Sequence, residues 1–199
     1  MSDQDRPLII KIGGSLIEYA SGIIRTIRES KRNVLIIPGG GIFADLVRQK
    51  EISDTAAHFM AIAAMDQYGW VLSSYGMPIT HEPVMTGVPY IFLPYSHLVH
   101  TDPLPHSWDI TSDTISAYYA RLLSVPLLLL KSVDYIRASE GAVLMLKPGM
   151  ETDDLDPAFI PYIFDHHIEG YIIRGSDYSR LAGFLRGDAV MGTGFGGTI

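Results

Sequence analysis

The sequence predicts an α/β fold, a three-layer αβα sandwich around a mainly parallel central sheet. Short apolar runs alternate with helical patterns along the whole chain, which is typical of strand–helix–strand units. Two of these runs, residues 34–37 and 125–130, have no polar position, as expected of strands covered on both faces. Hydrophobic residues make up 47% of the chain, enough for a large core. Since no linker, repeat or low-complexity segment is visible, we expect a single domain over residues 1–199.

The composition narrows the class of protein. The net charge is −7 without a basic tract, so nucleic acid is not an expected partner. The absence of cysteine excludes disulfides and thiolate chemistry. We see neither a signal peptide nor an apolar run of membrane-spanning length, and we expect a cytoplasmic protein without membrane contact. Only 19% of residues are charged, which leaves apolar surface and favours a homo-oligomer, a dimer or larger.

The first part of the chain contains two strands that end in glycines. Residues 8–12 form the first strand, and Ser15 is placed to cap the helix that follows. Residues 34–37 form the second strand, which leads through three glycines into a helix at about 42–50. A longer helix, residues 53–75, is rich in alanine and methionine. Its apolar excess makes it our candidate subunit interface.

The remainder begins irregularly, because residues 77–105 contain six prolines. Short strands are expected there, around Ile79 and at 90–93. A helix is predicted at 114–123, and Asp113 at its start has the position of an N-cap. The later elements are predicted in this order: a strand at 125–130, a hairpin at 135–146 turning at Glu140-Gly141, short helical pieces within 153–164, a strand at 171–173, a helix at 177–185 and a last strand within 192–199.

Two turns have the features of a phosphate-binding cradle. Lys11 precedes Gly13, Gly14 and Ser15, and a second strand runs into residues 39–41, which are all glycine. Because glycine lacks a Cβ, its backbone N–H can approach a ligand closely, and a helix that starts there adds its positive end. The glycine spacing fits neither a P-loop nor a dinucleotide fingerprint. We predict that Lys11 stabilises a transferred phosphoryl group; an ordinary turn with a surface lysine is the alternative.

Charged residues gather at two later points. Asp113 could orient Lys11 and a second lysine instead of capping its helix, and Asp109 could hold Mg²⁺ or a polar group of the substrate. Lys131 and Asp134 follow a buried strand, at the carboxyl end where ligands of open α/β sheets bind, although a lysine there could equally reach solvent. None of the seven histidines has zinc-site spacing, and we assign no metal ligand.

Four motifs together resemble the amino-acid kinase superfamily, which includes uridylate, acetylglutamate and isopentenyl phosphate kinases. They are Lys-Ile-Gly-Gly-Ser, Pro-Gly-Gly-Gly, Thr-Ser-Asp-Thr and Leu-Leu-Lys-Ser-Val-Asp, in matching order over nearly the whole chain. The terminal Gly-Gly-Thr-Ile resembles the closing strand of that family. The resemblance implies a three-layer αβα fold, ATP with Mg²⁺, and transfer of the γ-phosphoryl group to an oxyanion acceptor.

The resemblance also implies roles for the matching positions. Lys11 and Asp113 would be catalytic, with the aspartate organising the lysines. Phosphate would be bound by Gly13, Gly14 and Ser15, the acceptor by Gly39, Gly40 and Gly41, and ATP by Lys131, Ser132 and Asp134. To the acceptor site we add Asp45, Arg48 and Asp109, which are residues of this chain and not part of the family pattern. The N-terminal part of the domain would therefore hold the acceptor, and the C-terminal part would hold ATP.

The residues that flank the second glycine turn narrow the range of possible acceptors. Pro38 stands where isopentenyl phosphate kinases have a histidine, and Arg48 comes later than the arginine of uridylate kinases. Asp45 favours a substrate with a positive group. The chain is most similar to compact kinases of methanofuran biosynthesis, which implies a small phosphorylated substrate, aminomethyl-furan methyl phosphate. The alternatives are a uridylate-type nucleoside monophosphate kinase and a storage protein that binds nucleotide or oxyanions without turnover.

Overall fold

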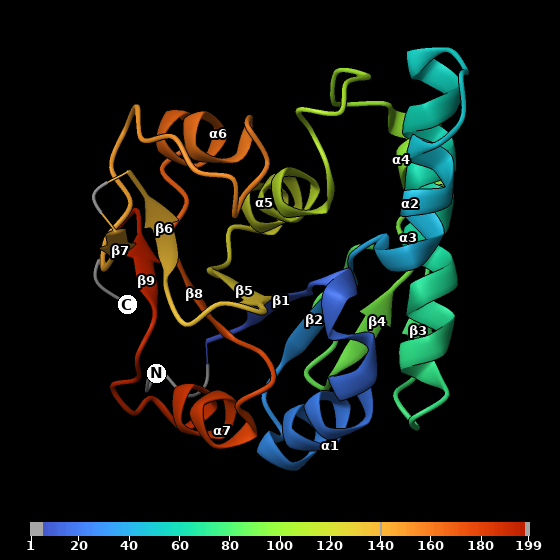
Figure 1. Cartoon of the computed structure of the whole chain (residues 1–199). Coiled ribbons are helices and arrows are strands. Elements are labelled where there is room, and N and C mark those ends of the chain that lie inside the picture. The colour runs from blue at the N-terminus through green and yellow to red at the C-terminus, as the bar shows by residue number, and fades with distance from the viewer. Residues whose placement is uncertain (1–5, 140, 198–199) are drawn as a thin grey trace.

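The computed structural model describes residues 6–139 and 141–197, which contain a seven-stranded sheet (Figure 1). The strand order is β3-β4-β2-β1-β5-β8-β9, and only β9 runs antiparallel to its neighbour. The prediction of a mainly parallel sheet is therefore confirmed. Its strands are β1 (Leu8–Ile12), β2 (Val34–Pro38), β3 (Ile79–Thr80), β4 (Tyr90–Phe92), β5 (Leu127–Lys131), β8 (Gly170–Arg174) and β9 (Thr193–Phe195). A separate hairpin pairs β6 (Ile136–Ala138) with β7 (Gly141–Val143).

Helices cover both faces of the sheet, which confirms the three-layer αβα sandwich. Helices α1 (Ala20–Ser30) and α7 (Tyr178–Arg186) lie on one face, and α5 (Ser112–Leu123) and α6 (Phe159–Asp165) lie on the other (Figure 1). Three further helices gather near β2 and β4: α2 (Gly41–Arg48), α3 (Asp54–Ser73) and α4 (Tyr95–Thr101). No helix among the described residues is both long and apolar enough to cross a membrane.

The alternation of side chains along β1 explains why this strand buries a charge. All five of its residues are buried, and Leu8, Ile10 and Ile12 join the core on the α1 and α7 side. Ile9 joins the core on the α5 side. Because side chains alternate with a period of two, Lys11 extends toward the same face as Ile9, where α5 begins. The strand pattern thus directs one lysine into the layer beneath α5.

Three predicted details of the elements are wrong. Ser15 caps no helix, because a 3₁₀ helix, η2 (Gly14–Tyr19), starts one residue earlier and Ser15 falls inside its first turn. Asp113 is not the N-cap of α5, because Thr111 occupies that position and the Asp113 carboxylate faces two lysines instead. The β7 strand ends at Val143 and does not reach residue 146.

Other boundaries agree closely with the sequence. Helix α3 starts after Ser53, whose hydroxyl accepts a hydrogen bond from the Ala56 backbone N–H, and α7 starts after Asp177, which caps it in the same way. The closing strand occupies Thr193–Phe195, ahead of the Gly-Gly-Thr-Ile motif, whose last two residues lie outside the described part. Glu140, at the predicted hairpin turn, lies outside it as well.

Candidate active site

The candidate site lies where β1, β2 and β5 end at the same edge of the sheet. The Gly13 backbone N–H donates to the Leu130 carbonyl oxygen at 3.0 Å, and the Gly39 N–H donates to the Ile12 carbonyl oxygen at 2.8 Å. These bonds continue the parallel ladder past the last strand residues. They hold both glycine turns beside the end of β5, at the carboxyl edge where parallel sheets bind ligands.

Lys11, Asp113 and Lys131 form a buried charged triad below the turns. The Lys11 Nζ lies 2.7 Å from Asp113 Oδ1, and the Lys131 Nζ lies 2.6 Å from Asp113 Oδ2. Lys11 is 4% exposed and Asp113 is 2% exposed, so water screens their attraction poorly. The three side chains come from β1, α5 and β5. One carboxylate therefore fixes two ammonium groups at the carboxyl edge of the sheet.

The protonation of the triad follows from burial and proximity. Burial lowers the pKa of the Lys11 ammonium, although the Asp113 carboxylate acts in the opposite direction. Burial alone would raise the pKa of Asp113, but the ammonium groups of Lys11 and Lys131 outweigh it and hold that pKa well below its usual value. Asp113 is therefore ionised at neutral pH and favours the charged form of Lys11.

Asp156 supports the triad from a distant part of the chain. Its Oδ2 accepts hydrogen bonds from the backbone N–H groups of Thr111 and Thr114, both at 2.9 Å, and its Oδ1 accepts one from the Thr111 hydroxyl. It thus takes the capping role at α5 that the sequence suggested for Asp113. Burial and the nearby Asp113 carboxylate raise the pKa of Asp156. The start of α5, which carries Asp113, is tied to the segment before α6.

The two glycine turns pack so closely that side chains would not fit. A Cβ on Gly14 would lie 2.1 Å from the Gly41 Cα, and a Cβ on Gly39 would lie 2.9 Å from the Gly14 backbone nitrogen. Gly41 has φ +54°, in the left-handed region that favours glycine. Gly13 lies near the lysine, since its Cβ would be 3.8 Å from the Lys11 Nζ. Backbone amides and the lysine therefore share one small space.

A pocket of about 310 Å³ opens beside these turns. Gly14, Ser15, Gly40 and Gly41 line one side of it. Helices α2 and α3 and the segment at 107–115 form the rest of the wall, which is mainly apolar. The site thus combines a phosphate-sized cradle with a cavity for the remainder of a small molecule.

The structure brings four of the predicted acceptor-binding residues to this pocket and leaves two, Gly39 and Asp109, outside its lining. Asp45 and Arg48 line it from α2, and the Arg48 guanidinium stacks 4.7 Å from the centre of the Trp108 ring. Asp109 is exposed and does not line the pocket, whereas its neighbours Trp108 and Ile110 do.

The residues expected to bind ATP lie at the end of β5 and just after it. Lys131 reaches Asp113, whereas Asp134 pairs with Arg174 at 2.8 Å and with Arg180 at 2.9 Å. Ser132 lies between them and is exposed. Neither these residues nor Lys11 line the pocket.

Sequence reasoning missed three residues of the site. Asp156 gave no signal beyond an Asp-Pro turn, because its partners are 42 and 45 positions away. The sequence predicted a role for Asp109 and none for the neighbouring Trp108. His58 lines the pocket together with Asp54 and Ile62 of the same helical face, and this spacing of four is visible in the sequence.

Comparison with known proteins gives one close relative by sequence. No family model matches the chain. The chain is 30% identical over 200 residues to the [5-(aminomethyl)furan-3-yl]methyl phosphate kinase of Methanocaldococcus jannaschii. The alignment covers 90% of this chain and 93% of the relative.

Solved structures of the same fold are similar over almost the whole chain. Uridylate kinase from Archaeoglobus fulgidus has a TM-score of 0.71 and 17% identity, with 94% of this chain and 99% of that one covered. UMP kinase from Ureaplasma parvum has a TM-score of 0.72 and 14% identity, with 96% and 98% covered. These likenesses concern the fold, which is that of the amino-acid kinases. The chain is a phosphotransferase and belongs to the [5-(aminomethyl)furan-3-yl]methyl phosphate kinase family.

Proposed function

We propose that this protein transfers the γ-phosphoryl group of ATP to the phosphate of [5-(aminomethyl)furan-3-yl]methyl phosphate. The observation that carries the proposal is the buried Lys11–Asp113–Lys131 triad beside a pocket with carboxylates along its wall. The triad suits a reaction between two phosphates, and the pocket suits an acceptor that also bears an ammonium group. The acceptor itself is taken from the name of the relative.

In the proposed reaction an oxygen of the acceptor phosphate attacks the γ-phosphorus. A new P–O bond forms while the bond to the β–γ bridging oxygen breaks, and ADP leaves with that oxygen. The dianionic acceptor needs no base, so the protein contributes position and charge. Lys11 stabilises the negative charge of the transferred group, and Asp113 orients Lys11 and Lys131 through its two ion pairs. The N–H groups of Gly14 and Gly41 hold phosphate oxygens, whereas the Gly13 N–H is already bonded to the Leu130 carbonyl oxygen.

The pocket side of the triad binds the acceptor in this proposal, and the Asp134 side binds ATP. Residues 39–41, Asp45 and Arg48 would hold the acceptor, while Lys131, Ser132 and Asp134 would contact the nucleotide. Mg²⁺ would be held mainly by the ATP phosphates, because both Asp113 oxygens are paired with lysines and Asp109 lies outside the pocket. When bound, the ion would neutralise phosphate charge. The N-terminal and C-terminal parts would thus be the two halves of one domain.

An ADP-release assay with two acceptors tests the proposal. We expect turnover with [5-(aminomethyl)furan-3-yl]methyl phosphate, and a diphosphate product by mass spectrometry. Turnover of UMP alone would assign the protein to the nucleoside monophosphate kinases. Retention of ATP without ADP release with either acceptor would indicate a binding protein instead.

A further inference from the structure

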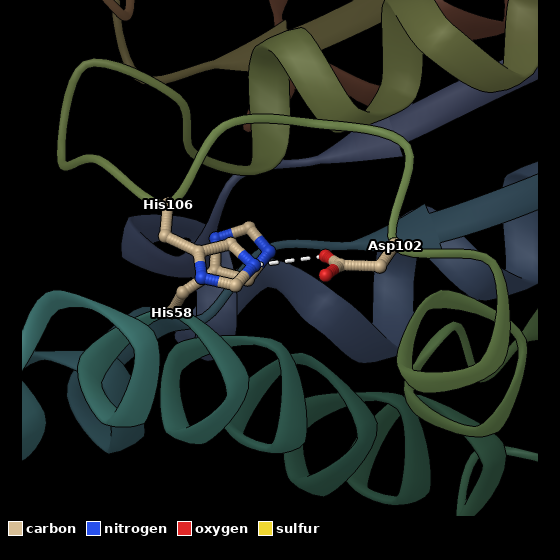
Figure 2. A group of neighbouring side chains, drawn as sticks. All are labelled: His58, Asp102 and His106. Carbon is tan, nitrogen blue, oxygen red and sulfur yellow. Dashed lines mark hydrogen bonds and ion pairs between the residues drawn. The ribbon is translucent and has the colours of Figure 1, made fainter.

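Three side chains from separate segments meet at the α3 wall of the pocket (Figure 2). His58 projects from α3, Asp102 follows the last residue of α4, and His106 lies in the loop that leads to α5. The rings of His58 and His106 stack with centroids 4.4 Å apart. Phe59 contacts both rings edge-on.

His106 is fixed at both of its ring nitrogens. Its Nε2 lies 2.8 Å from Asp102 Oδ1, and its Nδ1 lies 3.0 Å from the Thr55 hydroxyl oxygen. A histidine bonded in this way cannot rotate without losing one bond. His106 is therefore a rigid platform, and its contact with His58 restricts the second ring.

His58 is buried but keeps its polar atoms available. Its side chain lines the pocket, and the residue is 9% exposed. No hydrogen bond joins either of its ring nitrogens to another described residue. The ring nitrogens keep accessible surface at the pocket wall, so a ligand that enters the pocket can form a hydrogen bond with the held imidazole.

The arrangement favours a hydrogen-bonding imidazole over a metal ligand. One donor atom from each of the three residues lies within 4.8 Å of the others, which is close enough to consider an ion. However, the planes of the two rings differ by only 24°, so their in-plane lone pairs run side by side and do not converge. Both nitrogens of His106 are also already engaged.

We propose that His58 is a specificity-determining residue that accepts a hydrogen bond from the ammonium group of the acceptor. This inference rests on the proposed function. Asp54, one helical turn before His58, lines the same wall, and Asp45 lines the neighbouring wall from α2. Two carboxylates make this end of the pocket suitable for a cation. Arg48, the cation among the lining residues, is stacked on Trp108.

The charge state of His58 agrees with a role as hydrogen-bond acceptor. Burial lowers the pKa of His58 below its usual 6.5, His106 lowers it further, and Asp102 opposes both. The other charged groups that share its pocket are Asp45, Arg48 and Asp54. The neutral ring therefore presents a lone pair at neutral pH. Protonation would place a second cation against the ammonium, so the KM for the acceptor rises as the pH falls through this pKa, with less effect on kcat.

The test compares two acceptors in three variants. The first acceptor is [5-(aminomethyl)furan-3-yl]methyl phosphate, and the second carries a methyl group in place of the aminomethyl group. In His58→Ala we expect the KM for the first to rise about 10- to 100-fold, the range for a lost bond to a charged group, while the KM for the second stays unchanged. His58→Gln, which retains an acceptor oxygen, should restore part of the discrimination. His100→Ala, at an exposed histidine of α4, is the matched control.

The outcomes separate this inference from the proposed function. Failure of the wild-type protein to phosphorylate the aminomethyl acceptor removes the proposed function and this inference with it. If wild type and His58→Ala both turn over normally and discriminate equally between the two acceptors, this inference is overturned while the proposed function stands. One equivalent of zinc in purified wild type, absent from His58→Ala and retained in His100→Ala, would also overturn it, because a metal-bound nitrogen accepts no hydrogen bond.

Discussion

At the scale of single residues, one buried carboxylate governs the charge of the candidate site. Asp113 contacts two lysines within 2.7 Å in surroundings that exclude water. Taking a charge out of water is costly, and an uncompensated buried charge is costlier still. The triad therefore combines two properties, a positive field at the carboxyl edge of the sheet and a dependence of folding on Asp113. These properties can be separated by substitution.

Replacing Lys11 with methionine tests the field. Methionine is apolar and similar in length, and Asp113 keeps Lys131 as a partner, so the free energy of unfolding should change little. We expect kcat to fall by about 10²- to 10³-fold, as when one electrostatic contact to a transition state is removed. Steady-state kinetics and urea unfolding measure the two effects. Lys31→Met, at an exposed lysine after α1, is the control; equal kcat in both variants would contradict the role of Lys11.

Replacing Asp113 with asparagine tests how strongly the stability of the fold depends on the Asp113 charge. Two lysines lose their counter-ion, and we expect a loss of about 3–5 kcal/mol in the free energy of unfolding at neutral pH. The folded pKa of Asp113 lies below the unfolded value of 3.8, so its contribution is complete above that pH and is lost as the pH falls through the folded pKa. The difference between wild type and variant in urea unfolding should shrink in acid. A difference independent of pH would argue against the ion pairs.

At the scale of elements, the start of α5 is held by a side chain from elsewhere in the chain. Thr111 and Thr114 donate their backbone N–H groups to Asp156, so the helix lacks a cap of its own. The first turn of α5 also carries Asp113. The position of the triad thus depends on how the segment before α6 packs against α5.

Asp156→Ala should therefore impair both stability and turnover. Loss of an N-cap costs about 0.5–2 kcal/mol, and the freed N–H groups of α5 are only partly reached by water. We expect thermal unfolding at lower temperature and a reduced kcat, because Asp113 is less firmly placed. Asp156→Asn keeps one acceptor oxygen, so its unfolding temperature and kcat should lie between those of wild type and Asp156→Ala. Thermal unfolding and kinetics check this, and an Asp156→Ala variant as stable and active as wild type would exclude the capping role.

At the scale of the whole molecule, α2 and α3 present apolar side chains to solvent. The exposed ones include Ile42 and Leu46 on α2, and Met60 and Trp70 on α3. Trp70 is 56% exposed, which is high for a side chain of its size. Large exposed apolar side chains on two neighbouring helices are typical of an interface. We propose that α3 contributes to a homo-oligomer, as its alanine- and methionine-rich sequence suggested.

Trp70→Glu tests the interface. A charge buried between subunits is costly, so we expect the variant to have a smaller mass in solution than wild type. Light scattering after gel filtration gives the mass of each. Leu122→Glu, at an exposed leucine of α5, places the same charge away from α3 and should leave the assembly intact. A monomeric wild type, or a Trp70→Glu variant of unchanged mass, would rule out this surface.

The sequence predicted the fold well because strands and helices leave local patterns. All-apolar runs such as residues 34–37 identified β2, and glycines at strand ends identified the turns at Gly13 and Gly39. Side-chain direction at helix starts was less predictable. Asp113 has the local appearance of a cap, and only the proximity of Lys11 and Lys131 turns it inward.

By itself, the sequence determined the αβα architecture, the two glycine turns and the family resemblance, because each depends on residue type and spacing within a short window. The tertiary structure decided which side chains meet. Asp156 reaches α5 across more than 40 residues, and His58 and His106 stack across 48 positions. Such contacts depend on how the helices pack against the sheet, and no pattern within a short stretch of sequence specifies them. The pocket is therefore a property of packing.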